Sequence, residues 1–338
     1  MIDTMKFAIG ISEECFKNIK KIGVETVQRD NTKNVENFRI LKSDIPIDSY
    51  DRHISIYCPS QEVANIEFSL PKYLFGENIH MINSDQVVEI VGKVYKDFSS
   101  KFGSIQPFND WIIKRLDLCY IWKLSSKKEE TQILLVLKSL EYLNKTKKHL
   151  YDTSVMWTGQ TYSFKYYLKR PEFLRNDFKQ LEKENKINLA HKLLKEAEHI
   201  LRFEITFRSA RVKTLLGSSS PKFSDLVHGD KPLEDLVFET LDYYQKRIFK
   251  VNPKIQNKVN TYDLLRDKYG KIKARRLEEF WNMYQSDNVS KARIKDNYSS
   301  SQLWRISRDL REAGIGISSS IDIDLPIDKN KLLAKVAR

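Results

Sequence analysis

The sequence predicts an α+β fold, with a mainly antiparallel β-sheet, helices packed on one face of it, and a smaller helical region at the C-terminal end. Up to about residue 215, segments that alternate apolar and polar side chains interchange with segments of helical periodicity. From about residue 225 only the helical pattern continues, and a Gly/Ser/Pro stretch at 216–221 separates the two parts. We therefore expect domains at residues 1–220 and 221–338.

The elements follow from local patterns. Runs rich in Ile, Phe, Tyr and Val with period-two alternation are typical of half-buried strands. They predict strands at 53–57, 63–70, 112–124, 154–157, 162–169 and 201–209. Apolar stripes of helical spacing predict helices at 86–102, 129–144, 171–183 and 188–199, and in the second part at 232–250, 262–269, 271–285 and 300–313.

Charge indicates the kind of partner. The 338 residues include 58 Lys and Arg against 45 Asp and Glu, a formal net charge of +13. A basic protein of this kind favours a polyanion such as nucleic acid. The alternative is that the excess charge only keeps the protein in solution.

Cysteine and histidine indicate no metal site or disulfide framework. The three cysteines, Cys15, Cys58 and Cys119, lack CxxC spacing, and the six histidines form no ligand pair. The N-terminus shows no export signal and no segment reaches membrane-spanning length, so we expect a cytoplasmic protein without a membrane partner.

Several predicted strands carry ionisable side chains on the face opposite their apolar side chains. Glu67, Asp117 and Glu204 occupy such positions, and each could lie on an ordinary solvent face. If the strands belong to one sheet, the three carboxylates can converge, and without histidine they suit Mg²⁺ or Mn²⁺. Nearby arginines would keep the carboxylates ionised and meet phosphate. These are Arg115, Arg202 and Arg208.

A tyrosine lies on such a polar face. In the segment 162–169, alternation places Tyr166 in the core and Tyr167 on the polar face with Lys169. A tyrosine can attack a phosphodiester when a base or cation favours its phenolate, and Lys169 could stabilise the developing charge. From the pattern alone, Tyr167 can equally be an ordinary strand residue.

The sequence resembles the filamentous-phage gene II replication protein and its plasmid relatives, the gene II/X family. The resemblance rests on four motifs in the same order and at similar spacing. They are Lys114–Leu118, Thr153–Trp157, Tyr166–Glu172 and Leu201–Glu204. It implies a rolling-circle initiator-like nuclease, an enzyme that nicks and rejoins one DNA strand at an origin through a tyrosine and a divalent metal.

The resemblance also implies roles for individual residues. Tyr167 matches the family's nucleophile and Lys169 its lysine, while Asp117 and Glu204 match acidic positions. Two further matches give less definite ligands. They are Glu67, whose segment diverges more, and Glu172, which would be a fourth ligand or a base, or would only favour the helix dipole.

The implied partners are double-stranded origin DNA, single-stranded DNA, and the polymerase and helicase of a bacterial host. The products would be a free 3′-OH and a 5′-phosphotyrosine. Two alternatives stay open: a non-catalytic origin-binding or copy-control protein, and a metal-dependent nuclease that uses water.

The predicted C-terminal helices carry basic side chains that suit DNA. They resemble a helix-turn-helix arrangement with a recognition helix at 300–313. The alternative is a solvated basic helix that packs on its neighbours. The residues concerned are Lys271, Lys273, Arg275, Arg276, Arg305, Arg308 and Arg311.

Overall fold

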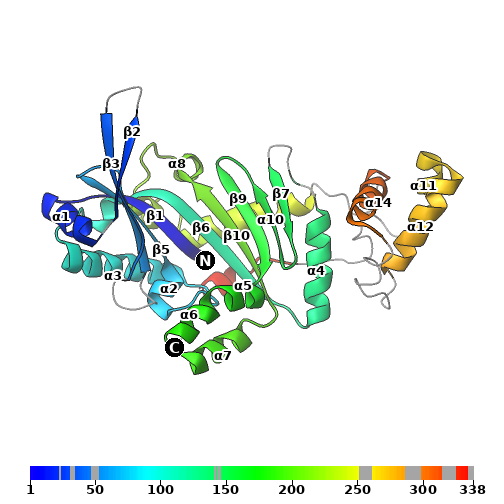
Figure 1. Ribbon diagram of the computed structural model, residues 1–338, viewed down its shortest axis with the longest axis horizontal. Coiled ribbons are helices and arrows are strands. Elements are labelled where there is room, and N and C mark those ends of the chain that lie inside the picture. Colours follow the sequence, from blue (N-terminus) through cyan, green and yellow to red (C-terminus); the bar gives the residue numbers. More distant parts are fainter. Residues whose placement is uncertain are drawn as a thin grey trace. The chain divides into compact units, whose positions relative to one another are not determined.

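A computed structural model shows a ten-stranded sheet within the residues that the structure describes (Figure 1). These are residues 1–22, 24–30, 35–46, 53–140, 142, 146–250, 261–285, 298–313 and 325–333. The strand order is β2-β3-β4-β5-β1-β6-β10-β9-β8-β7, and all neighbouring strands pair antiparallel. The predicted α+β fold with a mainly antiparallel sheet is confirmed.

The strands include all six that the sequence predicts and four that it did not. Their bounds are β1 Ile2–Gly10, β2 Val24–Asp30, β3 Val35–Pro46, β4 His53–Cys58, β5 Val63–Ser69, β6 Ile112–Lys123, β7 Lys147–Tyr151, β8 Ser154–Thr158, β9 Tyr162–Leu168 and β10 Ile200–Arg208. The central strand β1 has buried residues on both faces, which obscures the alternation. The edge strand β7 is polar and largely exposed.

Each predicted helix has a counterpart with somewhat different ends. The helices are α1 Glu13–Ile22, α2 Leu70–Phe75, α3 Ser84–Phe102, α4 Lys127–Ser139, α5 Lys169–Arg175, α6 Asp177–Lys183, α7 Ile187–Glu196, α8 Ser209–Leu216, α9 Phe223–Val227, α10 Leu233–Lys250, α11 Thr261–Tyr269, α12 Lys271–Gln285, α14 Ser300–Glu312 and α15 Lys329–Leu333, with a 3₁₀ turn at Phe108–Asp110. Of these, α1, α2, α8, α9 and α15 were not predicted. The helix predicted at 171–183 is two helices, α5 and α6, interrupted at Asn176. The strand predicted to reach Lys169 ends at Leu168, so Lys169 begins α5.

The apolar face of the sheet carries an aromatic core. Tyr166 of β9 stacks on Phe203 of β10 with ring centroids 4.5 Å apart, and Trp122 of β6 lies beside them. Helix α10 packs on this face through Tyr244, whose ring centroid is 5.6 Å from that of Phe207. Because this face holds the core, polar side chains of the same strands must point to the opposite face.

Helices α5, α6 and α7 form a smaller apolar cluster at one end of that opposite face. Phe173, Leu181 and Leu193 pack there with Ile200 of β10 and Ile121 of β6. Helix α5 follows β9 directly in the chain, and this cluster holds it at that end of the sheet (Figure 1).

The chain divides into two compact units. One holds Met1–Glu130, Leu143–Lys246 and Leu325–Arg338, and the other holds Thr131–Tyr142 and Arg247–Asp324. Helices α11, α12 and α14 of the second unit bury a separate core that includes Leu277, Phe280 and Leu310. The expected division into a nicking and joining domain at 1–220 and a helical DNA-binding domain at 221–338 stays a prediction. Within the described residues, no helix has both the length and the apolar character that crossing a membrane requires.

Candidate active site

The register of the central strands gathers ionisable side chains on one polar face. Across β10 and β9, Glu204 is opposite Lys165 and Arg202 is opposite Tyr167. Across β10 and β6, Asp117 is opposite Thr206. Directly opposed residues of an antiparallel pair share a face. The polar face predicted from alternation is therefore formed by neighbouring strands of one sheet.

Tyr167 lies at the centre of this polar face. Its hydroxyl donates a hydrogen bond to Glu204 Oε2 at 3.1 Å, whereas Tyr166 points into the aromatic core on the other face. Only 6% of Tyr167 is exposed. Burial raises the pKa of the phenol well above its ordinary value, Arg202 acts in the opposite direction, and Glu204 adds to the increase. The resting side chain is thus a neutral phenol held by a carboxylate.

Two cations contact the same carboxylate. Lys165 Nζ is 3.1 Å from Glu204 Oε1 and 4.7 Å from the centroid of the Tyr167 ring. Arg202 Nε is 3.5 Å from Glu204 Oε2. The two oxygens of Glu204 therefore face different partners, and Oε2 is the one that holds the phenol.

Arg202 is the buried anchor of the site. Its side chain is fully buried, with Nη2 2.6 Å from Asp3 Oδ1 and Nη1 donating to the carbonyl oxygen of Asn78 at 2.6 Å. Burial raises the pKa of Asp3, but Arg202 outweighs it and holds that pKa at about 2. The phosphate contact predicted for Arg202 would require this burial to open.

Arg115 links the other two predicted carboxylates. Its guanidinium donates to both oxygens of Asp117, at 2.9 and 2.6 Å, and to Glu67 Oε1 at 2.7 Å. Burial nevertheless raises the pKa of Asp117 to about 7, and the charge of Glu204 acts in the same direction against the Arg115 hydrogen bonds. Asp117 and Glu204 thus repel each other on one buried surface.

The three predicted carboxylates do not form one three-ligand cluster. Among the described residues, no group of three or more Asp, Glu, His or Cys side chains is placed to hold an ion. Arg115 occupies the space by which Glu67 would join the other two. Asp117 and Glu204 remain as a donor pair, and their mutual repulsion is what a bound cation relieves. Magnesium is commonly held by one or two carboxylates together with substrate phosphates and water, so this pair fits it.

Lys169 and Glu172 bind each other. The buried Lys169 Nζ donates to Glu172 Oε2 at 2.6 Å and to Asn78 Oδ1 at 2.7 Å, and burial lowers its pKa. Glu172 also accepts from Asn176 at 3.0 Å. In this arrangement Lys169 fixes the start of α5 and the loop at Asn78, whose carbonyl in turn holds Arg202. The catalytic role predicted for Lys169 and the ligand role predicted for Glu172 stay predictions.

A pocket of about 290 Å³ opens beside Glu204 on the polar face. Arg208 lines it and donates to the carbonyl oxygen of Gly159 at 2.8 Å. Basic and hydroxyl side chains surround a single carboxylate, which suits an anionic ligand. The lining residues are Arg115, Met156, Ser163, Phe164, Lys165, Glu204, Thr206 and Arg208.

Three residues of the site were assigned no role from the sequence. For Lys165, alternation already indicates the polar face of β9, two residues before Tyr167. Asp3 of β1 and Asn78 of the loop between α2 and α3 lie far along the chain from Arg202. No periodic pattern in the sequence connects these two residues with the site.

In the second unit, the described basic side chains that were predicted to bind DNA lie at exposed positions of α12 and α14, and their binding role stays a prediction. Four basic side chains of α12 are exposed: Lys271, Lys273, Arg275 and Arg276. On α14, Arg305 and Arg308 are exposed, and Arg308 lies 5.1 Å from the ring centroid of the exposed Trp304. Lys273 and Arg308 both pair with Asp309. The side chain of Arg311 lies outside the described residues.

The comparison with protein families agrees with the resemblance in the sequence. Residues 1–222 match the family described as the N-terminal part of the replication-associated gene II protein of phages. No curated protein matches the chain. A rolling circle replication initiator protein from Geobacillus stearothermophilus is a similar solved structure, with 11% identity over 71% of this chain and 83% of that one, and a TM-score of 0.35. Since the family match covers well over half of the sequence, this chain belongs to the family of replication-associated gene II proteins.

Proposed function

We propose that this replication-associated protein starts rolling-circle replication by nicking one strand of origin DNA with Tyr167. The observation that carries the proposal is the hydrogen bond from the Tyr167 hydroxyl to Glu204, on the polar face and beside a basic pocket. The site thus combines a nucleophile, a proton acceptor and a space that a phosphate can enter. Nucleophilic attack on a phosphodiester needs these three features together.

In the proposed step, the Tyr167 oxygen attacks the scissile phosphorus and its proton passes to Glu204 Oε2. The bond from phosphorus to the 3′ oxygen breaks, and that oxygen takes a proton from water. The products are a free 3′-OH and a 5′-phosphotyrosine. Because the phosphotyrosine is itself a phosphodiester, a later 3′-OH can attack it and rejoin the strand without ATP.

Lys165 is the cation best placed to assist this step. Its ammonium lies on the Tyr167 ring and on Glu204, and about a third of its side chain is exposed on the side of the pocket. It can follow the charge from phenolate to phosphate as the bond forms. Arg202 cannot do the same without uncovering a buried side chain, so it acts as the fixed positive charge beneath the site.

The cofactor in this proposal is Mg²⁺ or Mn²⁺, held by Asp117 and Glu204. When bound, the ion supplies positive charge to the phosphate oxygens. Glu204 has two functions in this proposal. Oε2, which faces the phenol, accepts the proton of Tyr167, and Oε1, which faces Lys165, is the oxygen left for the ion. Glu67 and Glu172 hold Arg115 and Lys169 in this structure, so the proposal rests on the other two carboxylates.

The proposed partners follow from the products. The first unit takes the exposed single strand, and the basic helices α12 and α14 bind duplex origin DNA. A host helicase would open the duplex, and a host polymerase would extend the 3′-OH. Net charge and the exposed basic side chains support a DNA partner.

The test is covalent capture of DNA. Wild-type protein is incubated with supercoiled DNA that carries the origin of its own replicon and with Mg²⁺, and DNA-linked protein is separated in a denaturing gel. Tyr167→Phe should bind DNA as the wild type does and form no adduct. Tyr166→Phe is the matched control, because its hydroxyl is buried in the opposite face without a hydrogen-bond partner among the described residues, and it should keep the adduct.

The outcomes separate the proposal from its alternatives. An adduct that persists in Tyr167→Phe, or that maps to another tyrosine, contradicts the assignment. Origin binding without any cleavage by the wild type identifies a non-catalytic replication or copy-control protein. Cleavage with free 5′ ends identifies a nuclease that uses water.

A further inference from the structure

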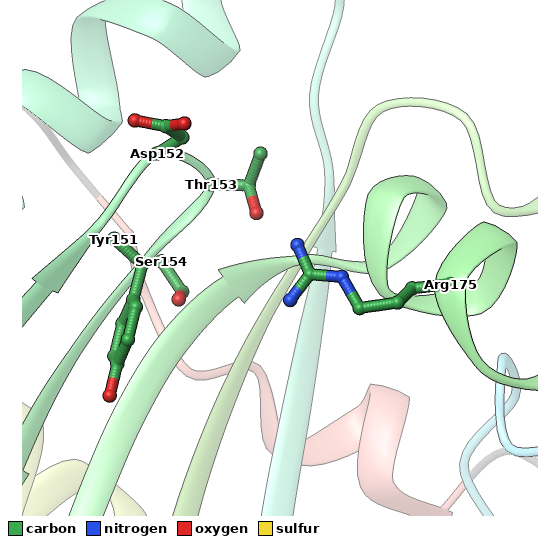
Figure 2. A pocket seen from close by; sticks show the side chains of 5 residues that line it. All are labelled: Tyr151, Asp152, Thr153, Ser154 and Arg175. Atoms are coloured by element: carbon green, nitrogen blue, oxygen red, sulfur yellow. The ribbon is translucent and has the colours of Figure 1, made fainter.

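A second pocket, of about 460 Å³, lies where the turn between β7 and β8 faces the last turn of α5 (Figure 2). Its lining is polar, and none of its residues belongs to the hydrogen-bonded groups around Glu204. The lining residues are Tyr151, Asp152, Thr153, Ser154 and Arg175.

This pocket adjoins the proposed nucleophile. Ser154 of β8 is the register partner of Tyr167 of β9, and the Leu168 amide donates to the carbonyl oxygen of Thr153 at 3.0 Å. Neighbouring strands in a sheet lie about 4.8 Å apart. A group bound in the pocket is therefore only one strand away from the Tyr167 side chain.

Arg175 gives the pocket an available positive charge. Among the described residues it forms no ion pair, in contrast to Arg170 on the same helix, whose Nε is 3.5 Å from Glu198. Figure 2 shows the Arg175 guanidinium directed toward the hydroxyls of Thr153 and Ser154. The Asp152 carboxylate is turned away from Arg175 in the same view.

These groups match the chemistry of a phosphate. A guanidinium offers several fixed N–H donors to phosphate oxygens, and hydroxyl side chains commonly add further hydrogen bonds to a DNA backbone. The only aromatic ring among the lining residues is that of Tyr151, which is directed away from Arg175 in Figure 2. The lining therefore offers no apolar surface beside Arg175 on which a base could stack. A backbone phosphate is thus the ligand that the lining favours.

We propose that Arg175, Thr153 and Ser154 bind a DNA backbone phosphate one or two nucleotides from the nick, and so hold the scissile bond against Tyr167. The inference rests on the proposed function, since it assumes that single-stranded DNA crosses the polar face of β10, β9 and β8. Arg175 is a positioning residue in this scheme. Its effect on the reaction comes through the placement of the strand.

The test is a binding measurement that does not depend on cleavage. Affinity for a fluorescent single-stranded oligonucleotide spanning the nick site is measured by anisotropy in EDTA, over a range of salt concentrations. Arg175→Gln should weaken binding about tenfold, as expected for one lost charge-assisted hydrogen-bonding group. The slope of log K against log salt should fall by about 0.7, the value for one phosphate contact on a single strand. Arg170→Gln is the matched control on α5 and should change neither quantity appreciably.

A phosphate scan locates the contact. Each backbone phosphate in turn is replaced by an uncharged methylphosphonate, and every oligonucleotide is measured with the wild type and with Arg175→Gln. For the wild type, one replacement within two nucleotides of the nick should weaken binding about as much as the Arg175 substitution does. That same replacement should have little further effect on the variant, because both changes remove one interaction.

The results decide between specific and general attraction. Equal losses in Arg175→Gln and Arg170→Gln, or additive effects of Arg175→Gln with every methylphosphonate, overturn the proposal. Failure of the adduct test on Tyr167 would instead leave these binding measurements unchanged. The two proposals can therefore fail separately.

Discussion

Replacing Asp117 with asparagine tests the electrostatics of the site through the stability of the protein. Folding raises the pKa of Asp117 from 3.8 to about 7, first through burial and then through the charge of Glu204. A carboxyl group with a raised pKa stabilises the folded state fully below its unfolded pKa. That contribution is lost as the pH rises to the folded pKa, because the folded state holds the proton that the unfolded state has released.

The size of the effect follows from the shift. Each pKa unit corresponds to 1.36 kcal/mol, so the two units between pH 5 and pH 7 correspond to about 3 kcal/mol. Asparagine cannot ionise. The free energy of unfolding of Asp117→Asn should therefore improve relative to the wild type by about 3 kcal/mol between pH 5 and pH 8. The weaker contact of asparagine with Arg115 changes the free energy of unfolding of the variant by the same amount at both pH values. The pH dependence of the difference between variant and wild type is therefore unaffected by it.

Urea unfolding at pH 5 and pH 8 measures this difference. Asp110→Asn is the matched control, because Asp110 pairs with Lys222 at 2.8 Å on the surface and is close to half exposed. Its difference from the wild type should be the same at both pH values. If the difference between Asp117→Asn and the wild type is also unchanged with pH, Asp117 is not held protonated by its surroundings and the reasoning is wrong.

Three further predictions concern the same site and the second unit. Lys165→Met should slow adduct formation at least tenfold and shift the pH profile of the rate toward higher pH, because the substitution removes the cation that contacts Tyr167 and Glu204. DNA affinity should change less, and an unchanged rate of adduct formation in single-turnover gels would contradict the role of Lys165. Mg²⁺ at millimolar concentration should raise the melting temperature of the wild type at pH 8, measured by calorimetry, and should raise that of Asp117→Asn or Glu204→Gln less. Glu13→Gln is the control, and equal increases in all four proteins would exclude Asp117 and Glu204 as the donor pair. Joint replacement of Arg275 and Arg276 by glutamine should lower the slope of log K against log salt concentration for duplex binding by up to about 1.8, and should leave cleavage of preformed single strands unchanged. Loss of single-strand cleavage would show that these exposed residues do more than bind duplex DNA.

Much of this site could be predicted because strand periodicity is a local property. The position of Tyr167 on the polar face and of Tyr166 in the core follows from alternation within β9 alone. The same rule places Asp117 and Glu204, and pairing in one sheet brings them together. The fold class is predictable for the same reason, since each strand and helix carries its own pattern.

The remaining features depend on contacts that no local pattern records. Arg202 meets Asp3 from the start of the chain and Asn78 from a loop, so its role as a buried anchor appears only in three dimensions. The C-terminal segment returns to the sheet in a similar way, where Trp122 Nε1 donates to the carbonyl oxygen of Pro326 at 2.8 Å. A chain cut after about residue 225 would lose both α10 and this contact.

The exposure of the cations indicates which of them can give way to substrate. Arg115 and Lys165 are each about one third exposed and neutralise the carboxylates that a metal and a phosphate would meet. Arg202 is fully buried and has two further partners, so moving it would leave Asp3 buried without its counter-charge, which is strongly unfavourable. Substrate binding should therefore displace Arg115 and Lys165 toward DNA phosphates and leave Arg202 in place. Because Lys165 lies over the Tyr167 ring, with its Nζ 4.7 Å from the ring centroid, its displacement would uncover that side of the phenol while Arg202 stays beneath.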